Sequence, residues 1–374
     1  MTCEYFGICG SCNLGGNTYK GQLDIKLDIE KNRFLDIYDG EYNVIESKDG
    51  AFRNRVEFRL WKEFGDNDKV TIHYAMNNKE KKPFTIKSCS IVSDHIAQIM
   101  PKLITILNDD EVFSLKVFAV EFLGSTTDDM LVTLIYHRKL DENWTKKAKE
   151  IEKSLGINLI GRSRKQKVVV SKEYIEDTLT INNNKYNFHY KEGGFTQPNQ
   201  KVNEKMIEWA INNSKHNGDL CELYCGGGNF TIPFSKSFNK VLATEISKTS
   251  INSAKENCTF NNIENIKFIR MSSEEFVEAR NGVREFRRMK QEDVMLDDYN
   301  FSTIFVDPPR AGLDDTTREL CGDFDQIIYI SCNPETLHRD LKELISTHKI
   351  EKFAFFDQFA YSSHIESGVI LYKS

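Results

Sequence analysis

The sequence contains no apolar run that approaches the roughly 20 residues of a membrane-spanning helix. Its first residues, Met1-Thr2-Cys3-Glu4, have neither the positive segment nor the apolar stretch of a secretory signal. Internal repeats and low-complexity tracts are also absent. These absences argue against a membrane protein and a secreted protein, so we expect a cytoplasmic protein with no membrane association.

An excess of positive charge is missing too. The chain has 50 basic and 56 acidic residues and a net charge of −6, which argues against a general polyanion binder but allows one basic face.

Its nine cysteines are odd in number and scattered apart from one N-terminal group, so a disulfide framework is not expected. With 374 residues, 40% of them hydrophobic, the chain is long enough to bury a sizeable core. No feature indicates an obligate protein partner.

From Gly218 onward, strand and helix signals alternate, which is typical of a doubly wound parallel sheet. Three apolar runs, 220–224, 303–306 and 326–330, each end on reactive or permissive residues. Because open α/β sheets bind their ligands beyond the carboxyl ends of their strands, these three ends predict one shared crevice. A Thr- and Asn-rich stretch near 175–195 indicates a boundary, and we divide the chain into domains 1–185 and 186–374.

The loop after the first of these runs carries glycines at 226, 227 and 228, so its backbone can approach a ligand closely. Glu245 follows about twenty residues later, where an acidic side chain suits a ribose diol. The spacing is not G-x-G-x-x-G. A dinucleotide site is the alternative, but a nucleoside without a pyrophosphate fits better and indicates S-adenosylmethionine.

Cys332 follows the run 326–330 in the sequence Ser-Cys-Asn-Pro, where Pro334 stops the strand. The position favours a nucleophile, whereas the usual fate of a cysteine is a buried structural thiol. Glu366 precedes the last strand-like run, 369–372, and could serve as a general base at the same sheet edge. Spacing alone does not decide whether Cys332 is a nucleophile or a structural thiol, or whether Glu366 is a base.

The N-terminal group, Cys3, Cys9 and Cys12, has the spacing C-x5-C-x2-C, and Cys89 is the one further cysteine in the first half of the chain. Four thiolates suit an iron–sulfur cluster or a tetrahedral zinc ion. The alternative is four ordinary reduced thiols.

The remainder of the first half predicts a mixed α/β part. Residues 17–36 favour a helix, although their apolar residues also alternate as in a strand. Residues 117–122 and 130–136 predict a strand pair, and 157–162 with 167–170 a basic hairpin. Residues 52–74 alternate, and one predicted strand face there carries Arg53, Arg55, Glu57, Arg59 and Trp61. Such a face could grip phosphates, or it could be a solvated face with cross-strand ion pairs.

Through most of its length the chain resembles the RNA uridine C5-methyltransferases, in particular the tRNA (uracil-5-)-methyltransferases. The most specific matching motifs are F-T-Q-P-N at 195–199, E-L-Y-C-G-G-G-N-F at 222–230, A-T-E-I at 243–246, N-G-V-R-E-F at 281–286, F-V-D-P-P-R at 305–310, S-C-N-P-E-T at 331–336 and F-D-Q-F at 356–359. Together these motifs are specific, and each alone is not.

The resemblance implies a Rossmann-like S-adenosylmethionine-dependent methyltransferase domain preceded by a mixed α/β RNA-binding domain. Cys332 matches the family's nucleophile, Glu366 its base, and Arg59 and Phe118 positions that contact the tRNA T-arm. The positions that match its cofactor site and active site are Gln197, Tyr224, Asn229, Glu245 and Asp307. The expected target is the T-loop uridine at position 54 of tRNA, which must leave its stack to be reached.

The N-terminal cysteines depart from this pattern. The best-known tRNA-modifying members lack them, whereas rRNA-modifying relatives carry such a motif and bind a [4Fe-4S] cluster. Many of those relatives also carry an N-terminal TRAM domain, for which this chain has no room. We therefore expect a tRNA uridine C5-methyltransferase with a [4Fe-4S] cluster on Cys3, Cys9, Cys12 and Cys89. An rRNA uridine C5-methyltransferase and an RNA-binding folding factor are the alternatives.

Overall fold

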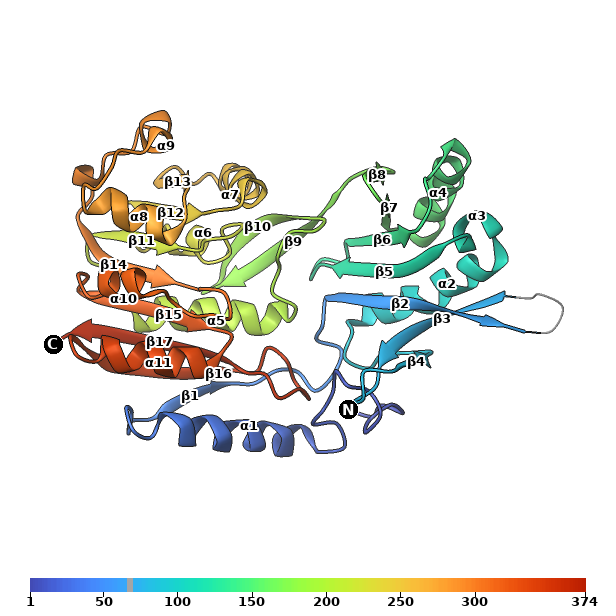
Figure 1. Ribbon diagram of the computed structural model, residues 1–374, viewed down its shortest axis with the longest axis horizontal. Helices are drawn as coiled ribbons and strands as arrows, with labels where there is room; N and C mark the ends of the chain where they lie inside the picture. Colours follow the sequence, from blue (N-terminus) through green and yellow to red (C-terminus); the bar gives the residue numbers. More distant parts are fainter. Residues whose placement is uncertain (66–69) are drawn as a thin grey trace.

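The computed structural model describes residues 1–65 and 70–374, which form two parts side by side (Figure 1). The larger part is built on an eight-stranded sheet of order β1-β16-β17-β15-β14-β11-β12-β13. Its strands are β1 (Tyr42–Ile45), β11 (Asp219–Leu223), β12 (Val241–Glu245), β13 (Ile266–Arg270), β14 (Phe301–Val306), β15 (Gln326–Ser331), β16 (His348–Phe356) and β17 (Glu366–Lys373). Neighbouring strands from β15 to β13 are parallel, and β17 is antiparallel to both of its neighbours. This is the predicted doubly wound sheet.

Both faces of this sheet are buried under helices, because its central strands are apolar on both sides. One face packs against α1 (Tyr19–Phe34), α8 (Ser273–Arg280), α10 (Asp315–Cys321) and α11 (Pro334–Leu344). The other packs against α5 (Gln200–Asn213), α6 (Thr231–Phe234) and α7 (Lys248–Phe260). Two short helical segments, α9 (Arg287–Gln291) and η2 (Leu296–Asp298), lie between α8 and β14.

The predicted helix at 17–36 is confirmed as α1, but it does not belong to the N-terminal sheet. α1 buries Leu23, Leu27 and Phe34 against the larger sheet, and β1 extends that sheet by pairing in parallel with β16. The ring of Phe34 lies 4.7 Å from that of Phe353 on β16. The division at 185/186 would place these elements in the N-terminal domain, whereas their packing joins them to the C-terminal sheet.

The second part is a seven-stranded sheet of order β4-β3-β2-β5-β6-β7-β8. Its strands are β2 (Arg55–Phe64), β3 (Val70–Asn77), β4 (Pro83–Ile86), β5 (Val117–Gly124), β6 (Met130–Tyr136), β7 (Asn158–Ser163) and β8 (Gln166–Val169). The predicted strand pair is β5 with β6, and the predicted basic hairpin is β7 with β8. The alternation over 52–74 covers two strands, β2 and β3. Three helices pack on one face: α2 (Asp94–Asp109), α3 (Glu111–Ser114) and α4 (Glu142–Leu155).

A two-stranded ribbon of β9 (Tyr174–Ile181) and β10 (Asn184–Lys191) connects the two parts. It packs on α5 and α7 of the larger part and reaches β6 of the smaller one. Among the described residues, no helix is both long and apolar enough to cross a bilayer.

Candidate functional site

A cavity of about 440 Å³ opens at the carboxyl end of β11, where the glycine loop begins. Tyr224, Gly226 and Gly228 all adopt positive φ, so the chain turns sharply away from the strand. A Cβ added at Gly226 or Gly227 would meet no atom within 4 Å, which leaves the backbone open to the cavity. The loop thus has the close backbone access that its sequence predicts.

Four of the predicted cofactor positions line this cavity: Gln197, Tyr224, Asn229 and Asp307. Glu245, at the end of β12, has a different contact, since its carboxylate accepts hydrogen bonds from the Gly226 amide (3.1 Å) and the Ser247 amide (2.8 Å). It therefore holds the shape of the glycine loop from the neighbouring strand.

Two buried oxygens at the cavity lack a hydrogen-bond partner within the described residues: Gln197 Oε1 and Glu222 Oε2. Burial raises the pKa of Glu222 to about 8, and the charge of Asp307 contributes to the rise. Buried acceptors of this kind are costly unless a donor reaches them, so the cavity fits a ligand that carries hydrogen-bond donors. The sequence pattern missed Glu222 as a site residue, although an acidic residue inside an apolar strand is a usable signal.

Cys332 and Glu366 lie next to each other at the carboxyl end of β15, where β17 begins. β15 and β17 are antiparallel neighbours, and Ser331 is paired with Ser367, so the residue after β15 faces the first residue of β17. Burial raises the pKa of Glu366 to about 8; Asp307 contributes to the rise and Arg310 opposes it. Burial likewise raises the pKa of the Cys332 thiol to about 11, Glu366 adds to the rise, and Arg310 opposes it. A thiol, a carboxyl and a guanidinium therefore influence one another here.

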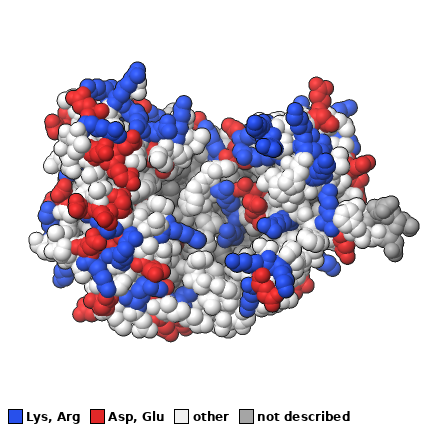
Figure 2. All heavy atoms as spheres, viewed as in Figure 1, with Lys and Arg blue, Asp and Glu red and all other residues white. Residues whose placement is uncertain are grey.

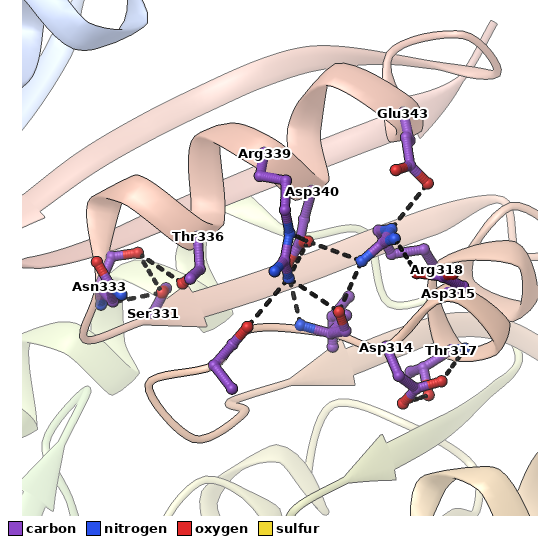
Figure 3. A network of polar contacts seen from close by, with 12 residues as sticks. Asp314, Asp315, Thr317, Arg318, Ser331, Asn333, Thr336, Arg339, Asp340 and Glu343 are labelled. Atoms are coloured by element: carbon purple, nitrogen blue, oxygen red, sulfur yellow. Dashed lines mark hydrogen bonds and ion pairs between the residues drawn. The ribbon is translucent and has the colours of Figure 1, made fainter.

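The first turn of α11, with Asn333 and Thr336 (Figure 3), fixes the loop that carries Arg310. Asn333 Nδ2 and Thr336 Oγ1 both donate to the Arg310 carbonyl, at 3.0 and 3.3 Å. Ser331 Oγ accepts from the Asn333 amide and donates to the Asn333 carbonyl, both at 3.1 Å. These bonds tie the residues on either side of Cys332 to each other, and the residues after it to the neighbouring Asp-Pro-Pro-Arg loop.

Further along α11, Arg339 and Asp340 hold the rest of that loop (Figure 3). Asp340 Oδ2 accepts from the Leu313 amide (2.9 Å) and the Tyr329 hydroxyl (2.6 Å), and Arg339 donates to the Ala311 carbonyl (3.0 Å). Gly312 adopts φ +74°, and a Cβ there would lie 2.7 Å from Asp340 Oδ2. Only glycine fits this turn, so the polar network and the glycine together determine the path of the loop.

On the smaller sheet, the predicted RNA-contacting residues lie on neighbouring strands. Arg59 on β2 is exposed and pairs with Ala119, next to Phe118 on β5. Phe118 stacks on His137, with ring centroids 3.9 Å apart and planes 12° apart. His137 was not predicted, because no local pattern relates it to Phe118. Figure 2 shows Lys and Arg side chains around the hollow between the two parts.

Two of the arginines on the predicted phosphate-gripping face have internal partners instead. Arg55 forms an ion pair with Glu121 (2.6 Å) and donates to the Gly194 carbonyl. Arg53 donates to the Arg55 carbonyl (2.8 Å), and burial lowers its pKa. Arg55 therefore follows the alternative interpretation, a strand face with cross-strand ion pairs, whereas Arg59 is exposed.

The [4Fe-4S] prediction is not supported. Cys3, Cys9, Cys12 and Cys89 line one cavity of about 470 Å³, together with Arg310 and His364, but they remain free thiols. Within residues 1–65 and 70–374, no three or more His, Cys, Asp or Glu side chains are grouped to hold a metal ion. In this shared cavity Cys12 packs with Phe52 and Tyr361, and Cys89 packs on the core of the smaller sheet. Burial raises the pKa of Cys12 to about 12, which favours its protonated form.

Sequence comparison with known proteins identifies relatives of this chain over nearly its whole length. The tRNA_U5-meth_tr family, described as tRNA (Uracil-5-)-methyltransferase, matches residues 18–374. The tRNA/tmRNA (uracil-C(5))-methyltransferase of Aliarcobacter butzleri is 61% identical over 374 residues, covering 100% of this chain and 99% of the relative. The protein of the same name from Sulfurovum sp. is 51% identical over 377 residues, covering all of both chains.

A solved structure supports the architecture. The crystal structure of Pyrococcus abyssi tRNA (uracil-54, C5)-methyltransferase in complex with S-adenosyl-L-homocysteine superposes with a TM-score of 0.73 at 20% identity. The superposition covers 96% of this chain and 85% of that one, and it confirms the predicted fold class, a Rossmann-like domain preceded by a mixed α/β part. Matched by the family over nearly its whole length, the chain belongs to the tRNA (uracil-5-)-methyltransferase family.

Proposed function

We propose that the protein is an S-adenosylmethionine-dependent enzyme that methylates C5 of the T-loop uridine of tRNA, position 54, through a covalent adduct with Cys332. The observation that carries the proposal is the pairing of Ser331 with Ser367, which sets Cys332 beside Glu366. The relatives named tRNA/tmRNA (uracil-C(5))-methyltransferase support the substrate class. The Pyrococcus abyssi protein of similar fold, a tRNA (uracil-54, C5)-methyltransferase, supports the position.

The glycine-loop cavity fits S-adenosylmethionine, which would supply an electrophilic methyl group on a positively charged sulfur. Gln197, Tyr224 and Asn229 line the cavity and would orient the bound molecule, with Glu245 supporting the loop. Glu222 and Asp307 lie at the same cavity, and a positively charged ligand there would favour the ionised forms of both carboxyls. The two unpartnered oxygens described above would receive its hydrogen-bond donors.

The chain's own groups account for the chemistry at the uracil ring. The Cys332 thiolate adds to C6, so that a C6–S bond forms and the electron pair of the C5=C6 bond moves toward O4. The resulting enolate makes C5 nucleophilic enough to take the methyl group, so that a C5–CH3 bond would form while the S–CH3 bond of the sulfonium breaks and its electron pair stays on the leaving thioether. The Glu366 carboxylate then accepts the proton from C5, the C5=C6 bond forms again, and the C6–S bond breaks to release the thiolate.

This mechanism predicts that turnover rises with pH. Cys332 must lose its proton and Glu366 must be ionised, and burial raises the pKa of these groups to about 11 and about 8. Raising the pH therefore increases the fraction of both active forms, with an inflection near pH 8 from Glu366. Multiple-turnover rates between about pH 6 and about pH 9.5 measure this, because they include removal of the C5 proton and release of Cys332. Binding of tRNA and cofactor at each pH is the control, and a flat or falling rate profile would contradict the assignment.

We further propose that the seven-stranded part, with Arg59 and the Phe118–His137 stack, binds the T-arm. Phe118→Ala should weaken tRNA binding by about 1–3 kcal/mol, the usual value of a base–aromatic stack. Affinity for S-adenosylmethionine should not change. The matched control is Phe64→Ala, which truncates an exposed phenylalanine on β2 of the same sheet. Equal losses of tRNA and cofactor affinity would indicate misfolding and would not support the proposed contact.

Mapping 5-methyluridine in the RNA of a deletion strain tests the substrate. The proposal predicts that the modification disappears from position 54 of tRNA and persists in rRNA. Its disappearance from rRNA alone would support the alternative of an rRNA methyltransferase. A Cys332→Ala gene that restores tRNA function without restoring the modification would reveal a separate folding role.

A further inference from the structure

A buried ion pair connects α1 to the loop that precedes Glu366. Lys26 on α1 contacts Asp357, just after β16, with 2.5 Å between Nζ and Oδ1. Their side chains are only 1% and 0% exposed, so both charges are removed from water. The two residues are separated by 331 positions in the chain. A charged pair buried this completely must be well compensated by hydrogen bonds to persist.

That compensation is present around Asp357. Its second oxygen, Oδ2, accepts hydrogen bonds from the Tyr19 hydroxyl (3.0 Å) and from Gln22 Nε2 (3.1 Å), both on α1. With Lys26, three side chains from successive turns of one helix converge on a single carboxylate. The backbone amide of Asp357 also donates to the Ile45 carbonyl at the end of β1 (2.9 Å).

The same side chains hold the loop 357–365 along its length. Lys26 Nζ donates to the Phe359 carbonyl (3.3 Å) and to the His364 carbonyl (3.2 Å). Gln22 Oε1 accepts from the Tyr361 amide (3.0 Å) in the middle of the loop. The loop is thus bound to α1 at its start, middle and end, and its next residue is Glu366.

We propose that Lys26 is a positioning residue for the methyl-transfer reaction: by joining Asp357 to the Phe359 and His364 carbonyls, it fixes the loop that sets the Glu366 carboxylate beside Cys332. This inference rests on the proposed role of Glu366 as the base. Removing one partner of a buried ion pair leaves the other charge uncompensated and destabilises the fold. The thermal stability of each variant is therefore measured beside its activity, so that a misplaced loop is distinguished from a loss of folded protein.

The test compares Lys26→Met with Lys20→Met. Lys20 lies on the same helix in an exposed ion pair with Asp24, so the substitution is identical but leaves the loop untouched. Lys26→Met should lower multiple-turnover methylation on the order of 100-fold, as expected for a misplaced reacting group. It should also accumulate a denaturation-resistant protein–tRNA adduct, because addition and methyl transfer still proceed while removal of the C5 proton is slow. KM for S-adenosylmethionine should remain that of the native protein.

A folded Lys26→Met protein that turns over like Lys20→Met and accumulates no adduct would overturn the proposal. If Lys26→Met does not fold, Tyr19→Phe carries the test, because it removes one hydrogen bond to the same carboxylate. Partial accumulation of adduct in Tyr19→Phe would support the proposal, and its absence would overturn it. Glu366→Gln is assayed in parallel. If that variant turns over normally, the role of Glu366 as base is wrong, a failure distinct from that of Lys26.

Discussion

Cys332→Ala should abolish methylation while leaving the binding of tRNA and S-adenosylmethionine nearly unchanged. Without the thiolate, C6 receives no nucleophile and C5 stays part of an electron-poor ring. The loss in turnover should be on the order of 10⁴-fold or more, as for removal of other catalytic nucleophiles. Folding should survive, because the hydrogen bonds around this turn involve Ser331 and Asn333 and not the Cys332 sulfur. Radiolabelled methyl transfer and filter binding measure the two effects.

Cys258→Ala is the control for Cys332→Ala. Cys258 is a buried thiol on α7, and its loss should not affect the chemistry at the edge of β15. Measurable turnover by Cys332→Ala above the background of the assay would remove this residue from the mechanism. Loss of tRNA binding together with activity would show that the substitution had disturbed the fold.

Glu366→Gln should convert the enzyme into one that forms its adduct but does not release it. The amide has the shape of the carboxyl but does not accept the proton from C5, so elimination of Cys332 stalls after methyl transfer. A protein–tRNA complex should survive denaturation and appear as a shifted band on a gel, with one methyl group transferred per protein.

Glu351→Gln is the matched control, because Glu351 is an exposed carboxylate on β16. It should turn over normally and leave no band. A Glu366→Gln protein that behaves in the same way would place the base elsewhere.

Much of the candidate site at the carboxyl ends of the strands could be predicted, because the sequence signals for these strand ends are local. The apolar runs that became β11, β14 and β15 end at glycines or prolines, and parallel strands bring such ends together. The register that sets Cys332 beside Glu366 was not predictable. It depends on the antiparallel insertion of β17 between β15 and β16, which joins segments far apart in the chain.

The failures of prediction share one physical cause, contacts between distant segments. Nothing in the sequence of α1 and β1 indicates which sheet they join. Their partners are the rings of Phe353 and Phe355, which lie on β16 near the other end of the chain. The Phe118–His137 stack likewise joins β5 to the residue after β6. The spacing of Cys3, Cys9 and Cys12 also suggested a metal cluster; these thiols line one cavity with Cys89, but the described residues contain no group of side chains that could hold a metal ion.

A T-arm RNA with 5-fluorouridine at position 54 tests the covalent mechanism most directly. After addition and methyl transfer, C5 carries fluorine in place of the proton that Glu366 would accept, so the adduct does not resolve. We predict a stable complex in which the peptide containing Cys332 carries the methylated nucleotide, identified by mass spectrometry. The same RNA should leave Cys332→Ala unmodified. Methylation of ordinary T-arm RNA without any covalent complex on the fluorinated one, or a complex on another residue, would contradict the mechanism.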